Sequence, residues 1–114
     1  MVERAMELLA KSQDLYVRLA VEITSARVGA ALGRSAEAVK TLEAALGEAE
    51  EKGFVGIHFE IRLALGETEI RSGDAGAGRV RLESVEKDAA ERGFGLIARK
   101  ARDVLARSPK PSPR

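Results

Sequence analysis

The side chains best suited to catalysis are scarce in this chain and form no recognisable set. Its 114 residues include one histidine, His58, and no cysteine. A nucleophilic triad needs a base that a third group orients, and no such set accompanies His58 in the sequence. Without cysteine there is no thiol nucleophile, disulfide or thiolate zinc site, and one histidine is too few for a histidine-based metal site. We therefore expect no enzymatic activity, no metal and no cofactor. We expect His58 to lie packed or at the core boundary, with a place along a groove as the alternative.

One glycine-rich run, Gly73 to Gly78, resembles a phosphate-binding loop in composition but not in context. Such a loop follows a buried strand and is followed by Lys and Ser or Thr. This run instead follows a charged helical segment and precedes Arg79. It predicts a turn and a close crossing of two helices. The acidic clusters at 48–51 and 83–88 predict solvated helix faces, because acid–base catalysis needs a carboxylate with a shifted pKa in a cleft.

Length and composition favour a single domain in the cytoplasm. The chain has the length of one domain, and its apolar residues are mostly Leu, Ala, Val and Ile. No apolar run approaches the ~20 residues of a membrane span, and Met1 is followed by charged residues instead of a signal-peptide core. We expect neither a membrane span nor a leader.

Charge is distributed unevenly along the chain. Residues 99–114 carry six basic side chains and one acidic side chain, although the whole chain has a net charge of only +1. The last eight residues, 107–114, alternate Pro with polar and basic residues and lack apolar side chains to bury. They predict a disordered, solubilising tail. Nucleic-acid binding through this basic end is the weaker alternative.

An internal repeat with a period of forty residues organises the chain. Residues 35–65 align with residues 75–105 without a gap. The matched pairs are Gly33/Gly73, Leu42/Leu82, Ala49/Ala89, Gly53/Gly93, Phe54/Phe94, Ile57/Ile97, Arg62/Arg102 and Leu65/Leu105. One register is held across Gly, Phe and Leu positions, which favours a repeated structural unit.

Each unit reads as a pair of helices. Residues 35–52 lack Pro, are rich in Ala, Leu and Glu, and precede Gly53, which suits a left-handed helix end. Residues 54–72 carry two apolar stripes, so this helix must be covered on two sides, inside a stack. We predict helices at 2–11, 14–32, 35–52, 54–72, 75–92 and 94–106, with no strand. Leu42, Leu65 and Leu82 should be buried.

The first residues read as the end of a preceding helix. Residues 1–11 correspond by the period of forty to the end of the helix at 35–52, and no polar cap precedes them. The chain is therefore expected to begin in mid-repeat. It is either a piece of a longer protein or a stack whose open end a partner covers.

The anchors of the repeat resemble the tetratricopeptide repeat. The second unit carries the family's pattern at Leu65-Gly66, Gly73-Asp74, Gly78 and Leu82. Two departures are the period of forty instead of thirty-four and the glycine at 53 and 93 where proline is usual. The resemblance implies an all-α domain over residues 1–106, in which antiparallel helix pairs stack as a short right-handed TPR-like solenoid of about 2 to 2.5 repeats. Units of this length resemble those of bacterial multidomain regulators.

In the phase of that family, the helices expected at 14–32, 54–72 and 94–106 are the first helices of successive pairs. The resemblance implies a concave binding groove lined by these first helices. On the central helix the candidate residues are Glu60, Leu63, Glu67, Ile70 and Arg71. On the flanking helices they are Ala20, Ile23, Arg27, Ala30, Ala31, Lys100, Asp103 and Arg107. Glu67 and Arg71 are four residues apart and are expected to pair. The implied function is a protein–protein interaction scaffold that binds a peptide or partner domain. Self-association through the open repeat end is the alternative.

Overall fold

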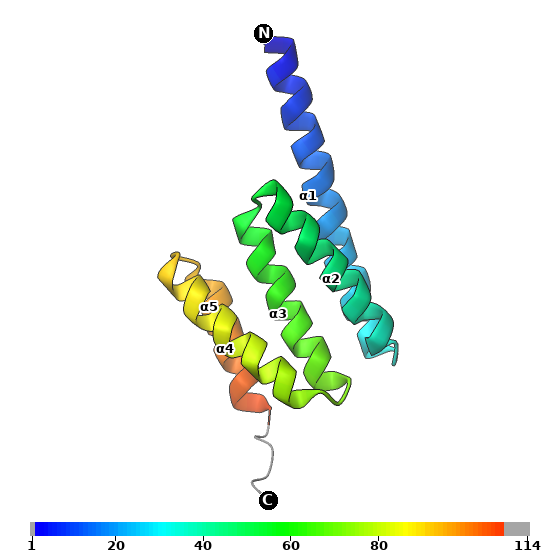
Figure 1. Cartoon of the computed structure of the whole chain (residues 1–114), viewed down its shortest axis with the longest axis vertical. Helices are drawn as coiled ribbons and strands as arrows, with labels where there is room; N and C mark the ends of the chain where they lie inside the picture. Colours follow the sequence, from blue (N-terminus) through cyan, green and yellow to red (C-terminus); the bar gives the residue numbers. More distant parts are fainter. Residues whose placement is uncertain (1, 109–114) are drawn as a thin grey trace, which may run out of the picture.

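The computed structural model describes residues 2–108, which form five α-helices and no strand (Figure 1). The helices are α1 (Val2–Ala31), α2 (Ser35–Lys52), α3 (Val55–Arg71), α4 (Ala75–Glu91) and α5 (Gly95–Arg107). Consecutive helices pack antiparallel, and α3 also contacts α1 and α5. Helices α1, α3 and α5 thus form one layer, and α2 and α4 lie over it in the view of Figure 1. The all-α expectation is confirmed.

The four turns between helices are built in the same way at intervals of twenty residues. Each contains a glycine with φ between 74° and 98°: Gly33, Gly53, Gly73 and Gly93. The residue after the glycine donates its amide proton to a carbonyl five residues earlier, as Phe54 N does to Ala49 O at 2.9 Å. This bond satisfies a helix-terminal carbonyl, and a positive φ is cheapest for glycine. The glycine spacing therefore fixes where helices end.

The separate helices predicted at 2–11 and 14–32 are wrong, because α1 is continuous from Val2 to Ala31. Twenty residues before Gly33 the chain has Gln13. A left-handed conformation costs a non-glycine residue ~1 kcal/mol, and residues 12–14 contain no proline to interrupt the helix. The helix therefore continues through this point. Residues 2–14 are all exposed and project beyond the other helices (Figure 1).

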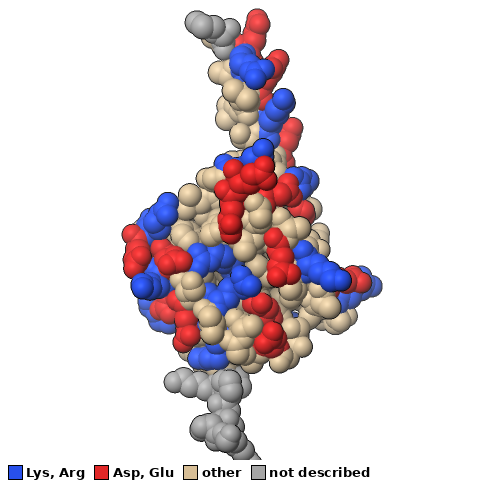
Figure 2. Space-filling view, in the orientation of Figure 1, with Lys and Arg blue, Asp and Glu red and all other residues tan. Residues whose placement is uncertain are grey.

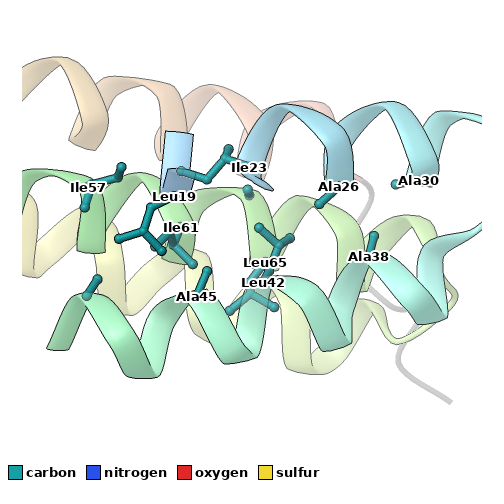
Figure 3. Packing of buried hydrophobic residues seen from close by; sticks show 12 residues of the cluster. Leu19, Ile23, Ala26, Ala30, Ala38, Leu42, Ala45, Ile57, Ile61 and Leu65 are labelled. Carbon is teal, nitrogen blue, oxygen red and sulfur yellow. The ribbon is translucent and has the colours of Figure 1, made fainter. Parts of the chain in front are cut away.

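Two apolar clusters lie on opposite sides of α3, which confirms the two stripes expected on this helix. The first cluster joins α3 to α1 and α2 (Figure 3) and contains Leu19, Ile23, Ala26, Ala30, Ala38, Leu42, Ala45, Ala49, Ile57, Ile61, Ala64 and Leu65. The second joins α3 to α4 and α5 and contains Phe59, Leu63, Leu82, Val85, Ala89, Ile97, Ala98 and Ala101. Leu42, Leu65 and Leu82 are fully buried, as expected.

The glycine-rich run forms a turn and a close helix crossing, as predicted. A Cβ atom on Gly78 of α4 would lie 2.7 Å from the carbonyl oxygen of Gly66 in α3. A Cβ atom on Gly66 would lie 2.6 Å from Leu82 Cγ. Helices α3 and α4 thus approach to a distance that only glycine permits. At the equivalent positions forty residues earlier, α1 and α2 carry Ala26 and Ala38.

Candidate binding groove

The exposed side of the α1, α3 and α5 layer contains a hollow of about 550 Å³. Its lining residues come from all three helices: Arg27, Leu63, Glu67, Lys100, Asp103, Val104, Ala106 and Arg107. Leu63 is buried and Val104 partly buried, so they form an apolar floor. The charged side chains surround this floor. Six of the residues expected to line a groove therefore lie together.

One ion pair joins two helices across this hollow. Arg27 Nη2 of α1 lies 3.3 Å from Glu67 Oε1 of α3. This geometry differs from the expected pairing of Glu67 with Arg71, which does not occur among the ion pairs of residues 2–108. Glu67 therefore pairs with Arg27 on a neighbouring helix and not with Arg71 on its own helix. Both side chains of the observed pair are partly exposed, so the pair contributes little to folding.

Two further hollows extend the groove along α3. One, of about 320 Å³, is lined by Ile70 and Arg71 together with Glu67 and Arg107. The other, of about 560 Å³, includes Glu60 between the first turns of α3 and α5. The three hollows together account for all five candidates on α3. From Glu60 to Arg71 they follow the helix for roughly 17 Å.

Some candidates on α1 do not belong to the groove. Ile23 and Ala30 are buried in the first apolar cluster. Ala20 is partly buried and packs against that cluster, and Ala31 ends the helix. All four were placed by the period of forty. Three of them face the first apolar cluster, whereas Ala31 is exposed at the last residue of α1. Of the residues expected on α1, only Arg27 lines the hollow.

A hollow that was not expected lies on the other layer, among the ends of α2, α3 and α4. It measures about 330 Å³ and contains His58, Phe59, Arg62 and Asp88 among its lining residues. His58 Nε2 is 3.3 Å from Glu50 Oε1 at the core boundary, as expected for this histidine. Arg62 lies 2.8 Å from Asp88 Oδ2, and its guanidinium carbon is 5.6 Å from the Phe59 ring centre. The His58 contact joins α3 to α2, and the Arg62–Asp88 ion pair joins α3 to α4.

Residues 2–108 contain neither a candidate metal-binding cluster nor a candidate membrane-spanning helix. Within them, no group of three or more His, Asp or Glu side chains has a geometry that could hold a metal ion. None of the five helices is long and apolar enough to cross a membrane. The expected lack of catalytic activity stays a prediction.

Comparisons with protein-family models, with curated proteins and with solved structures gave no match. The tetratricopeptide resemblance therefore depends on residues of this chain. Most of the expected basic tail, residues 109–114, lies outside the described residues, although α5 extends to Arg107, one residue further than expected. Nucleic-acid binding through that end also stays a prediction.

Proposed function

We propose that this chain is a protein-interaction scaffold that binds a peptide segment of another protein along the α1, α3 and α5 groove. In this proposal the five helices are a short TPR-like, right-handed stack, in which α1, α3 and α5 are the first helices of successive pairs. The forty-residue repeat and the buried equivalents Leu42 and Leu82 support this architecture.

One observation carries the proposal. Arg27, Glu67 and Arg107 stand forty residues apart in the sequence, and all three line the same hollow. Repeated helices thus bring equivalent positions side by side on one surface, which is how helical repeats build extended binding faces. Substitutions at these three positions would change the charge and shape of the surface without changing the buried core, so the surface can be adapted to a partner.

The lining indicates what kind of segment would fit. The apolar floor at Leu63 and Val104 suits one apolar anchor side chain. Around it, three cations face two carboxylates, and one of the cations, Arg27, is already paired with Glu67. Lys100 and Arg107 then leave the groove with an excess of positive charge, which favours a segment with acidic residues beside its anchor.

A peptide-display library selected against the folded chain tests the proposal. Selected peptides should carry an apolar residue flanked by Asp or Glu, and they should shift the amide resonances of α3 and α5 residues that line the groove. The double variant Lys100→Glu with Arg107→Glu should weaken their binding by ~10-fold or more, because it reverses the excess charge of the groove.

A matched variant separates the groove from overall charge. Lys40→Glu with Lys87→Glu makes the same change in net charge on exposed positions of α2 and α4. It should leave peptide affinity within about twofold, since rim charges far from a site act only through the screened field. Equal losses for the two double variants, or amide shifts confined to the other layer, would refute a binding site in this groove.

A further inference from the structure

Helix α1 carries a row of exposed apolar side chains that the rest of the fold does not cover. Six of them are between 54% and 74% exposed: Val2, Met6, Leu9, Val17, Val21 and Val28. Their spacing of mostly three, four or seven residues places them along one side of the helix. The side that packs against α2 and α3 carries a different set, including Leu19 and Ile23. Charged side chains occupy one edge of the projecting part of α1, and uncharged side chains occupy the other (Figure 2).

The repeat shows what such a row packs against. Forty residues after Val17 and Val21 stand Ile57 and Ile61 of α3, which are buried in the first cluster. They share that cluster with Leu42, Ala45 and Ala49 of α2. Forty residues before those three stand Val2, Ala5 and Leu9 of α1. Helix α1 therefore carries both halves of the contact that joins α2 to α3.

The two halves cannot meet within one copy. In α2 and α3 they are brought together by the turn at Gly53, with φ of 74°. The equivalent position in α1 is Gln13, which continues the helix. The surface at Val2, Ala5 and Leu9 and the surface at Val17 and Val21 therefore lie on one continuous helix, apart from each other, and remain exposed. Exposing these side chains to water is unfavourable, because fully burying a Val or Leu side chain stabilises a protein by roughly 1.5–3 kcal/mol.

We propose that two copies of this chain associate through α1 in an antiparallel pair, with residues 2–11 of each copy covering the surface around Val17 and Val21 of the other. The pair exchanges between copies the contact that α2 and α3 make within one copy, which is a domain swap and gives a two-fold, self-complementary interface. Its centre lies at Gln13, with Leu9 against Val17 and Ala5 against Val21 of the second copy. This surface shares no lining residue with the central hollow of the peptide groove, and it meets the end of the groove at Tyr16 and Phe54.

The dimensions of α1 suit this arrangement. Residues 2–24 would overlap over roughly 34 Å of helix, and a helix pair of that length buries on the order of 1,000 Å² in total, near the lower limit for specific interfaces. An apolar hollow of about 510 Å³, lined by Ser12, Gln13, Tyr16, Val17 and Phe54, lies at the centre of the pairing. The second copy's helix would fill it. We therefore expect a dimer that dissociates on dilution.

Sedimentation equilibrium tests the association. The parent chain should show concentration-dependent dimerisation, and Val17→Asp with Val21→Asp should be monomeric with unchanged helicity, since both side chains are exposed in one copy. Val80→Asp with Leu96→Asp places the same charges on exposed apolar positions of α4 and α5, and it should still dimerise. A parent chain that is monomeric at every concentration, or a dimer that survives the α1 variant, overturns the proposal.

Cysteine pairs distinguish the swap from other dimers, because the natural chain has no cysteine. Leu9→Cys with Val17→Cys, oxidised by oxidised glutathione, should link two copies covalently. Adding Gln13→Gly restores a glycine at the twenty-residue spacing and should let residues 2–11 fold back on their own copy. The same cysteines should then link within one chain, and the dimer should be lost. Failure of the parent cysteines to cross-link copies contradicts the proposed register.

Discussion

The first and last of the five helices expose chemically different surfaces. On α5, the positions equivalent to Phe59 and Leu63 of α3 are Arg99 and Asp103, both exposed. On α1, the positions equivalent to Ile57 and Ile61 are Val17 and Val21, also exposed. The α5 end has thus replaced apolar residues with charges, whereas the α1 end has kept them. A charged outer helix suits contact with water, and an exposed apolar row is typical of a surface that associates.

The ends differ again in the residues at their helix crossings and turns. The α3–α4 crossing uses Gly66 and Gly78, and the equivalent α1–α2 positions are Ala26 and Ala38. Every turn toward the α5 end contains glycine, whereas α1 runs straight through Gln13. The α1 end therefore combines a crossing without glycine, a missing turn and an uncovered surface.

The largest effect should come from comparing one apolar position with its equivalent forty residues away. Ile61 is 0% exposed and Val21 is 57% exposed. Ile61→Ala should lower the free energy of unfolding by about 2–5 kcal/mol, because it leaves a cavity in the first cluster. Val21→Ala, measured by urea denaturation at a concentration where the chain is monomeric, should change it by less than ~0.5 kcal/mol. Equal losses at the two positions would mean that the surface of α1 is not open.

The next effect concerns the close crossing of α3 and α4. Gly78→Ala should destabilise the fold by about 1–3 kcal/mol, because the new methyl group would overlap backbone atoms of α3. Gly76→Ala, two residues earlier in the same helix, meets no atom within 4 Å. It should stabilise the chain by up to ~1 kcal/mol through helix propensity. Thermal or urea unfolding of both variants measures the difference, and destabilisation by both would point to a cause other than the crossing.

A smaller effect should come from the turns. Gly53→Ala forces a side chain into the left-handed region and should cost ~1 kcal/mol. Its counterpart Gln13→Gly should cost a similar amount if residue 13 stays helical, and less if the chain folds back there. Urea denaturation of both variants gives the two costs. A stabilising Gly53→Ala would show that the left-handed glycine is not needed at that turn.

The smallest effect should come from the exposed pair that ties α1 to α2. Arg18 Nη1 donates to Glu48 Oε1 at 3.0 Å, and this hydrogen bond holds the pKa of the Glu48 carboxyl below its usual range. A lowered folded-state pKa gives stability that is present above the unfolded pKa and is lost as the pH falls through the folded one. Glu48→Gln should therefore lower the melting temperature slightly near neutral pH and not below the folded-state pKa. A deficit that persists in acid would assign the effect to packing.

Much of the fold follows from the sequence because it depends on local rules. The glycines that permit a positive φ mark the ends of α1, α2, α3 and α4, and the two stripes of α3 require cover on two sides. The burial of Leu42, Leu65 and Leu82 follows from the same periodicity. These properties are set by backbone sterics and by the spacing of apolar residues along one helix, so no knowledge of neighbouring elements is needed.

Other features were decided only by the tertiary structure. The repeat placed a helix end near Gln13, but the backbone there has no glycine to turn with, and α1 stays straight. Glu67 had a partner four residues away in sequence and instead pairs with Arg27 on another helix. The hollow beside His58 and Arg62 forms where three helix ends meet. Such contacts depend on the distances between helices, which are set by how side chains pack among all five helices and not by spacing along any one helix.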